Sequence, residues 1–293
     1  MDGIRWLRQK GYGLFQVCFE TTEVLQGGGR MKEEWYQPTW EEIIDESIKQ
    51  PLKFTKPLRL IELFAGIGSQ HEAFKRLQEK GILKVPFESY RVIEFDKYAI
   101  ASYNAIHNTN FSTQDITKIS AEDLGIVDTD KYQYLMFYSF PCQDISVAGK
   151  SNGFEKGTGT RSGLLWEVER LLNECKELPQ ILVMENVDAI LNSRNIENFK
   201  LWLDYLDSKG YTSKYQVLNA TDYGIPQHRK RCFCVSWLSG GGNEYYYNFP
   251  TPKPLNWCLQ DFLEKEPVDE KYYLPEEDIK EFIKNENIDI RNT

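Results

Sequence analysis

The sequence lacks any uninterrupted run of about 18 apolar residues, the length that a helix needs to cross a membrane. Its first 30 residues also lack the apolar core of a secretion signal. We therefore expect neither a membrane span nor a signal peptide. Six cysteines are present, but no two of them form a Cys-x-x-Cys pair. Neither a zinc site nor a disulfide framework is indicated, and reduced thiols in the cytoplasm are expected.

Positively charged residues are also fewer than negatively charged ones. The chain has 35 Lys and Arg against 44 Asp and Glu, so its net charge is −9. This balance argues against a protein that holds nucleic acid by overall charge alone, although it leaves room for a local basic face. Hydrophobic residues make up 41% of the 293 positions, an ordinary globular composition that argues against disorder.

Short apolar stretches alternate with helical patterns from residue 58 onward, and this alternation indicates βαβ units. We therefore expect an α/β fold, with a mostly parallel sheet and helices on both faces. Three segments follow: an amino-terminal extension over 1–55, a central domain over 56–238 and a last segment over 239–293. The expected strands are 58–64, 90–95, 132–139, 180–184, 212–219 and 231–237. The expected helices are 69–80, 97–107, 163–176, 196–209 and an acidic one over 275–287.

The start of the chain allows two interpretations. Three glycines and Arg30 stand directly before Met31, and such a sequence can be encoded by a purine-rich ribosome-binding site. Translation would then begin at Met31, and residues 1–30 would not be part of the protein. The alternative is a real, flexible amino-terminal tail.

A glycine-containing turn follows the first expected strand. Phe64-Ala65-Gly66-Ile67-Gly68 stands between a strand and a helix, where glycines let the backbone approach a ligand closely. His71 occupies the place of the third glycine of a dinucleotide fingerprint. A pyrophosphate cradle is therefore disfavoured, and a nucleoside that carries an amino acid is the better guest.

Acidic residues follow the next strands. Glu94, at the end of the second strand, can accept hydrogen bonds from both hydroxyls of a ribose. Asp115, after a possible third strand, could accept one from an adenine amino group. The alternative for Glu94 is a capping or solvated carboxylate. Asp96 is expected to cap the helix that follows it.

A cysteine follows the apolar strand 132–139. In Phe140-Pro141-Cys142-Gln143 the thiol stands at a strand end, where the thiolate could act as a nucleophile. The alternative is a buried structural cysteine. That structural interpretation is the one we expect for Cys175, Cys232, Cys234 and Cys258.

A long loop follows the cysteine, and two sets of charged residues stand farther along the chain at strand ends: Glu185, and Arg229 with Arg231. Residues 149–163 are rich in glycine and mildly basic, a composition that suits a mobile lid. Glu185, beside apolar residues, can donate a proton. Arg229 and Arg231 stand at alternating positions, suited to a base carbonyl or to phosphate. By itself, that cluster is most often a solvated basic patch.

Taken together, these residues resemble the cytosine-5 DNA methyltransferase family. Phe64-Ala65-Gly66-Ile67-Gly68 is similar to the cofactor turn of the family, and Pro141-Cys142-Gln143 to its catalytic motif. Glu185-Asn186-Val187 is similar to its glutamate motif, and Gln227-His228-Arg229-Lys230-Arg231 to its arginine motif. The four blocks stand in the family order over residues 58–237.

The resemblance implies a Rossmann-like methyltransferase fold, with S-adenosylmethionine as methyl donor and a cytosine flipped out of duplex DNA as substrate. Cys142 would attack C6 of the base, Glu185 would hold N3, and Arg229 and Arg231 would support the base carbonyl and Glu185. The residues implied at the cofactor are Phe64, Gly66, Gly68, Glu94, Asp115 and Pro141. Those implied at the DNA are Gln143, Ser146, Lys150, Arg161 and Gln227.

The carboxyl-terminal part departs from the family pattern. Only about 55 residues follow Trp237, whereas the family has a target-recognition domain, a further block and a final helix there. We expect residues 239–293 to be a linker and the start of a truncated target-recognition region. A restriction-modification or phage enzyme whose second polypeptide reads the DNA is the favoured hypothesis. A non-catalytic remnant that binds S-adenosylmethionine and a tRNA-directed enzyme remain as alternatives.

Overall fold

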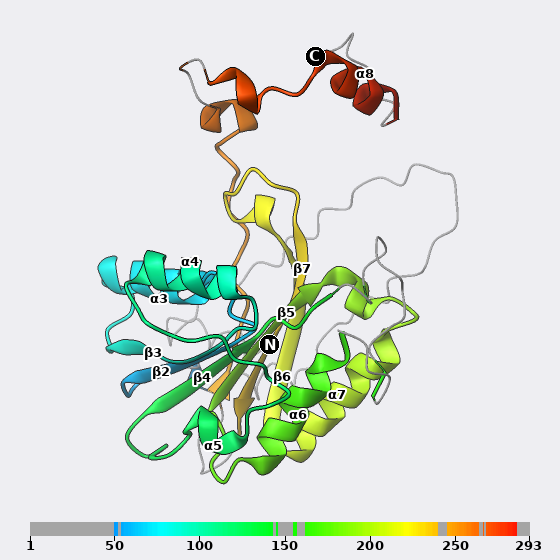
Figure 1. The fold of residues 1–293 in the computed structure, drawn as a ribbon. Coiled ribbons are helices and arrows are strands. Elements are labelled where there is room, and N and C mark those ends of the chain that lie inside the picture. Colours follow the sequence, from blue (N-terminus) through cyan, green and yellow to red (C-terminus); the bar gives the residue numbers. More distant parts are fainter. Residues whose placement is uncertain are drawn as a thin grey trace, which may run out of the picture. The chain divides into compact units, whose positions relative to one another are not determined.

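One mixed sheet of six strands organises the part of the chain that can be described (Figure 1). The computed structural model describes residues 50–51, 54–142, 145, 155–156, 162–239, 245–263, 266 and 268–285. The sheet has the order β3-β2-β4-β5-β7-β6. Its strands are β2 (Leu58–Leu63), β3 (Phe87–Ile93), β4 (Gln133–Tyr138), β5 (Ile181–Val187), β6 (Tyr211–Asn219) and β7 (Lys230–Leu238).

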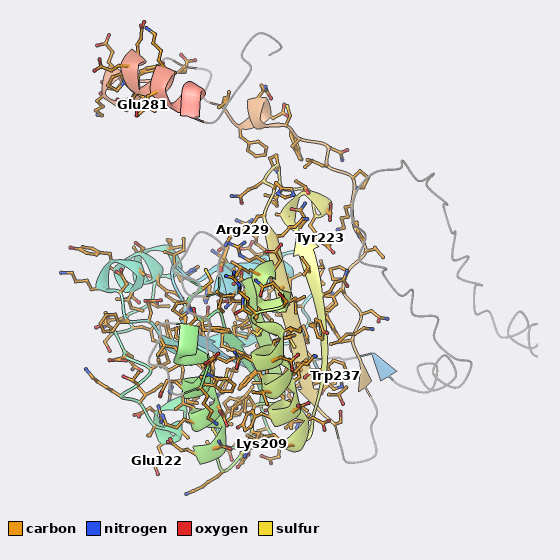
Figure 2. The ribbon with its side chains drawn as sticks, turned by 90° about the vertical axis from the view of Figure 1, so that its right-hand side faces the viewer. Glu122, Lys209, Tyr223, Arg229, Trp237 and Glu281 are labelled. Carbon is orange, nitrogen blue, oxygen red and sulfur yellow. The ribbon has the colours of Figure 1, made fainter. Side chains whose placement is uncertain are left out.

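The strand directions bring the start of β7 to the edge of the sheet where the parallel strands have their carboxyl ends. Strands β3, β2, β4 and β5 pair in parallel, whereas β7 is antiparallel to both β5 and β6. Arg231, near the start of β7, therefore pairs with Val187 at the end of β5. Arg229 and Trp237 lie toward opposite ends of β7 (Figure 2). The predicted, mostly parallel sheet is confirmed.

Helices cover both faces of the sheet, as expected. On one face lie α3 (Ser69–Glu79) and α4 (Lys97–His107), and on the other lie α5 (Ala121–Leu124), α6 (Leu165–Glu174) and α7 (Ile196–Ser208) (Figure 1). The remaining described elements are α8 (Glu276–Asn285) and a short parallel pair, β1 (Gln50–Pro51) with β8 (Tyr245–Tyr246). Of the described helices, α7 is the longest, at 13 residues, and none has the length and apolar character that a membrane crossing demands.

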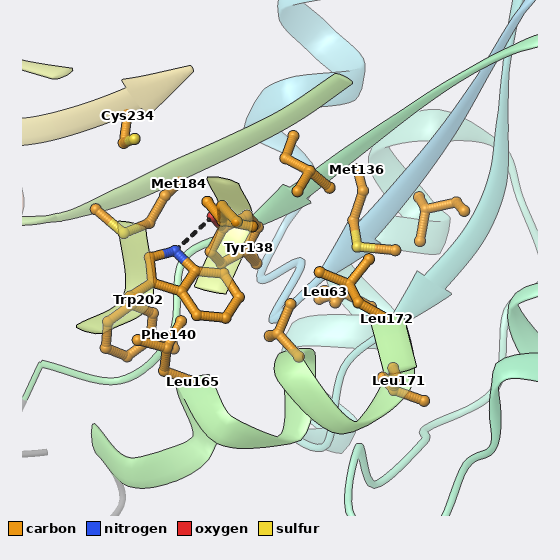
Figure 3. Close-up of a cluster of buried hydrophobic side chains, with 14 of the residues drawn as sticks. Leu63, Met136, Tyr138, Phe140, Leu165, Leu171, Leu172, Met184, Trp202 and Cys234 are labelled. Atoms are coloured by element: carbon orange, nitrogen blue, oxygen red, sulfur yellow. Dashed lines mark hydrogen bonds between the residues drawn. The ribbon is translucent and has the colours of Figure 1, made fainter. Parts of the chain in front are cut away.

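Period-two alternation along the strands builds the core. Ile61 and Leu63 of β2 join the larger apolar cluster, beneath α6 and α7, while Leu58 and Leu60 join the cluster beneath α3. Trp202 of α7 lies at the centre of the larger cluster, fully buried. Its indole N–H donates to the hydroxyl of Tyr138 at 3.1 Å, which satisfies both buried polar groups (Figure 3). The aromatic residues of this chain thus serve as core filling on this face.

The segment between α4 and α5 differs from the expectation. No strand precedes Asp115 in the fully described stretch 108–120. The side chain of Asn104 instead bonds both the N–H and the carbonyl of Phe111, each at 2.8 Å. Because this amide satisfies backbone groups that a strand would pair in a ladder, the segment stays irregular. The possible third strand was therefore wrong.

Candidate active site

The turn after β2 has an unusual backbone. Phe64 and Gly66 have φ of 58°, and Gly68 has φ of 84°. Left-handed backbone costs a residue with a side chain about 1–2 kcal/mol, and outliers of this kind often occur at functional sites. The carboxylate of Glu94 accepts from the N–H groups of Gly66 and Asp96, both at 2.8 Å. Glu94 therefore lies against the turn and helps to fix it.

A cavity of about 520 Å³ opens beside this turn, on the sheet face that α3 covers. Four of the residues predicted for the site line it: Phe64, Gly66, Glu185 and Arg229. A Cβ atom built on Gly66 would meet no atom within 4 Å. The turn therefore presents bare backbone to open space, as close binding of a ligand requires. The volume is in the range of small-molecule sites, about 300–1,000 Å³.

The lining also includes residues that the sequence analysis did not assign: Ala65, Ile67, Ser69, Gln70, Ala73, Phe74, Phe137, Ser139, Val183 and Phe233. The lining residues on or next to the strands could have been predicted from the alternation of side chains along a strand. Phe137 and Ser139 alternate at the end of β4, and Val183 alternates with Glu185 on β5, so each pair faces the same side of the sheet. Those on α3 depend on how the helix packs, which sequence alone does not determine.

Asp115 lies beside the cavity region rather than in its wall. The N–H of Gln114 donates to the carbonyl of Glu94 at 2.8 Å, which brings the segment to the end of β3. The carboxylate of Asp115 accepts from the hydroxyl of Thr117 at 2.8 Å and from its N–H at 3.0 Å. These bonds, with the nearby Lys118, lower the pKa of Asp115, so the group is a ready acceptor. The backbone segments that carry Glu94 and Asp115 are thus adjacent.

Cys142 lies in a turn that β5 anchors. The side-chain N–H of Asn186, which is 2% exposed, donates to the carbonyl of Phe140 at 3.0 Å. The N–H of Ile145 then donates to the carbonyl of Cys142 at 3.0 Å. The Cys142 thiol is half-buried. Pro141 and Cys142 are not in the cavity wall, but Ser139, close before them, is.

Three other cysteines have thiols that are poorly suited to nucleophilic attack. Burial raises the pKa of Cys232 to about 12, and that of Cys234 and of Cys175 to about 11. Such thiols stay protonated near neutral pH. The expectation of structural cysteines at these positions agrees with this environment. For Cys258 it was wrong, because that residue is exposed at the start of a short 3-10 turn.

Glu185 forms an ion pair across two antiparallel strands. The guanidinium of Arg231 lies 3.0 Å from its carboxylate, and both side chains are about one quarter exposed. Glu185 pairs with Phe233 and Val187 with Arg231, so the two charged side chains share one sheet face. Geometry of this kind restricts how the carboxylate can rotate.

The remaining predicted residues fall into two groups. Arg229 is exposed, and Asn219 fixes its backbone by accepting its N–H at 3.0 Å. Gln227 is exposed in the preceding loop. Gln143, Ser146, Lys150 and Arg161, most of the 149–163 loop and the extension over 1–49 lie outside the described residues. Within the described part, no three His, Cys, Asp or Glu side chains are grouped closely enough to hold a metal ion.

Comparisons with known proteins agree with this geometry. Residues 58–292 match the C-5 cytosine-specific DNA methylase family. The type II methyltransferase M2.ScrFI of Lactococcus lactis subsp. cremoris is 34% identical, over 74% of this chain and 70% of the relative. The orphan methyltransferase M.SssI of Spiroplasma monobiae is 35% identical, over 63% of this chain and 60% of the relative. The chain thus spans 60 to 70% of the length of these two relatives.

The fold has a counterpart of known structure. The S. pombe Dnmt2 methyltransferase superimposes on 80% of this chain and 67% of its own, with a TM-score of 0.59 and 21% sequence identity. At this identity the likeness concerns the fold. The expected Rossmann-like methyltransferase architecture is confirmed.

Proposed function

Because the chain belongs to the C-5 cytosine-specific DNA methylase family, we propose that it transfers a methyl group from S-adenosylmethionine to C5 of a cytosine in DNA. The relatives named as type II methyltransferases favour a role in a restriction-modification system. Such an enzyme acts where cellular DNA is accessible, which in a bacterium is the cytoplasm.

One observation carries the proposal. Glu185 and Asn186 are consecutive on β5, so their side chains point to opposite faces of the sheet. Glu185 faces the cavity and pairs with Arg231. Asn186 holds the carbonyl of Phe140, two residues before Cys142. A single strand end therefore positions both a carboxyl group and a thiol, which supports a shared task for the two.

The residues at the turn suit the proposed cofactor. Gly66 offers bare backbone to the cavity, and Phe64 lines it. Glu94 and Asp115 offer carboxylate acceptors for ribose hydroxyls and for an amino group. Asp115 keeps capacity for such a bond, because each carboxylate oxygen can accept twice. S-adenosylmethionine, when bound, supplies the methyl group on a positively charged sulfur.

Cytosine is a poor nucleophile at C5, so the protein must first change the electronic structure of the base. The Cys142 thiolate would bond to C6 of a base flipped out of the duplex. Glu185 would hold a proton at N3, so that negative charge does not accumulate on the ring, and Arg231 would keep Glu185 in place. The resulting enamine carbon, C5, becomes the nucleophile. Loss of the C5 proton after methylation would break the bond to Cys142 and restore the aromatic ring.

Contacts to the DNA would come from the residues that the family resemblance implies there, which are Gln143, Ser146, Lys150, Arg161 and Gln227, with Arg229 close to the last of them. Gln227, exposed before β7, and Arg229 at the cavity belong to one short loop. Basic residues here would supply the local positive face that the overall charge of −9 does not.

A second polypeptide that reads the DNA sequence is the remaining predicted partner. Copurification with the tagged full chain from its native cells tests that partner directly.

The proposed activity is tested with the full chain, radiolabelled S-adenosylmethionine, and either unmethylated duplex DNA of mixed sequence or total tRNA. We expect label in the DNA, recovered as 5-methylcytosine after hydrolysis. Label in tRNA alone would overturn the DNA substrate and favour the tRNA-directed alternative. Binding of S-adenosylmethionine by calorimetry, with no transfer to either nucleic acid, would favour a non-catalytic remnant.

A further inference from the structure

The cofactor turn rests on two side chains of α4. Gly68 approaches them so closely that a Cβ atom there would lie 2.4 Å from Nε2 of His107 and 2.5 Å from Cε2 of Tyr103. Tyr103 is fully buried. These two rings therefore pack directly against the turn at Gly68.

His107 also makes a directed contact with the turn. Its Nε2 lies 2.9 Å from the carbonyl oxygen of Ile67. A carbonyl only accepts, so Nε2 must carry the proton. Nδ1 of the same ring is buried and has no hydrogen-bond partner within the described structure. A proton on Nδ1 would be buried and unsatisfied, so this environment selects the tautomer with its proton on Nε2.

A second histidine packs against the first, with the two rings tilted by 43°. The rings of His71 and His107 have centroids 4.3 Å apart. Nδ1 of His71 lies 2.7 Å from the hydroxyl of Ser89, which donates to Oε1 of the buried Glu62 at 2.8 Å. Because Ser89 has a single proton and gives it to Glu62, it accepts from His71. His71 therefore carries its proton on Nδ1, the opposite tautomer to His107.

Glu62 ties this chain of contacts to the first strand. Its carboxyl is 0% exposed, and its Oε1 also accepts from the hydroxyl of Tyr103 at 2.7 Å. Burial raises the pKa of Glu62, an effect that the bonds from Tyr103 and Ser89 oppose. The buried carboxyl of Glu62 on β2 thus binds side chains of β3 and α4 directly, and His71 of α3 through Ser89. The series of contacts continues from His71 to His107 and ends at the carbonyl of Ile67. None of these groups belongs to the proposed chemistry.

We propose that His107 is a positioning residue for the cofactor: it holds the Ile67 carbonyl and supports Gly68, so that the turn keeps the shape that S-adenosylmethionine binds. The inference rests on the proposed function, because it assigns the turn to that cofactor. His107 touches neither the thiol of Cys142 nor the Glu185–Arg231 pair by any described contact. Its loss should therefore weaken binding of the cofactor and leave the chemical step unchanged.

Two substitutions of similar size separate the hydrogen bond from packing. His107→Gln keeps an N–H donor near the position of Nε2, whereas His107→Leu keeps apolar volume and has no donor. For the full chain, calorimetry with S-adenosylmethionine should show about tenfold weaker binding for His107→Leu. Binding by His107→Gln should stay within about threefold of the unsubstituted chain. In methyl transfer, KM for S-adenosylmethionine should rise for His107→Leu while kcat stays the same.

The results separate this inference from the proposed function. Equal affinity in the two variants, or a fall in kcat alone, would overturn the positioning role while the proposed function stands. Failure of the unsubstituted full chain to bind S-adenosylmethionine would overturn the proposed function, and the inference with it.

A measurement without substitutions keeps the inference testable if His107→Leu does not fold. The chain has only three histidines, so ¹⁵N-labelled imidazole signals are few enough to assign. We expect the His107 ring to carry its proton on Nε2 and the His71 ring to carry its proton on Nδ1. A His107 ring with its proton on Nδ1 would overturn the inference, because Nε2 could not then donate to Ile67.

Discussion

The guanidinium of Arg231 lies 3.0 Å from the carboxylate of Glu185, on the side of the sheet that also forms the cavity. The pair joins the end of β5 to the start of β7, so it depends on the antiparallel insertion of β7. A carboxyl group that must meet one ring nitrogen needs a fixed orientation, and a guanidinium provides it. We therefore expect the pair to contribute to the proposed reaction more than to the free energy of unfolding.

Arg231→Leu should lower kcat for methyl transfer by about 10²–10³-fold, the cost of losing one precisely placed electrostatic partner. The free energy of unfolding should change little, because the pair is partly exposed. Activity assays together with urea unfolding check both. Arg194→Leu, which removes an exposed arginine that is not part of the cavity lining, should match the unsubstituted chain. Equal kcat in the two variants would contradict the role of Arg231.

Asn186→Leu should misplace the turn that carries Cys142. The substitution leaves the buried carbonyl of Phe140 without its donor, which should lower the free energy of unfolding by about 1–3 kcal/mol. Activity should fall more than this loss of stability explains, while affinity for S-adenosylmethionine stays within about threefold. Urea unfolding, kcat and calorimetry measure the three quantities. A variant as active as the unsubstituted chain would show that the Phe140 contact does not position Cys142.

The two glycines of the turn should respond differently to alanine. Both have positive φ, which costs an alanine about 1–2 kcal/mol. A Cβ at Gly66 enters open space beside the cavity, so Gly66→Ala should fold but bind S-adenosylmethionine weakly. A Cβ at Gly68 would collide with His107 and Tyr103, so Gly68→Ala should lose more unfolding free energy. Equal stability of the two variants would contradict the close packing beneath Gly68.

Much of the fold followed from residue patterns. The helix 97–107 was predicted to the residue, since Asp96 accepts from the N–H groups of Tyr98 and Ala99, as a cap should. The apolar runs that became β4 and β5 were found because central parallel strands are buried on both faces. The irregular stretch before Asp115 was missed, because the bonds that Asn104 makes across it depend on packing rather than on periodicity.

The candidate site, like the fold, could be predicted from the sequence only in part. Residues at strand ends, such as Glu94 and Glu185, were identifiable because parallel strands bring their carboxyl ends together. The network from Glu62 to His107 was not identified. Its members are far apart in sequence and lie on four elements, so only the packing of α3 and α4 on β2 and β3 reveals it.

The unfolding free energy should depend on His71 in mild acid. Burial, together with the electrostatic effects of His107 and Lys75, lowers the pKa of His71, against a smaller opposite effect of Glu72. The unfolded chain takes up a proton near pH 6.5, whereas the folded chain does so only at lower pH. The stabilisation is thus full above about pH 6.5 and is lost as the pH falls.

The test compares urea unfolding of the unsubstituted chain and of His71→Asn between pH 7.5 and 5.5. Asparagine keeps a donor near Nδ1 but does not titrate, so the variant should lose less stability on acidification. Glu62 is common to both proteins, and its raised pKa acts with the opposite sign. An identical pH dependence in the two proteins would show that His71 has no lowered pKa.

Cys142→Ser should abolish methyl transfer and leave affinity for S-adenosylmethionine within about twofold, because a serine hydroxyl is far less nucleophilic than a thiolate. Cys258→Ser is the matched control, since that cysteine is exposed and free. It should retain full activity. Methyl transfer assays and calorimetry check both variants. Activity in Cys142→Ser would refute the assignment of the nucleophile.

The central claim, that Cys142 forms a covalent bond to cytosine, has a direct test. Duplex DNA containing 5-fluorocytosine is incubated with the full chain and S-adenosylmethionine. After methylation the fluorine on C5 cannot leave as a proton does, so the adduct should persist through denaturing electrophoresis. We predict a DNA-linked peptide that contains Cys142, and no adduct from Cys142→Ser. Methyl transfer to ordinary DNA without this adduct, or an adduct at a different cysteine, would contradict the account.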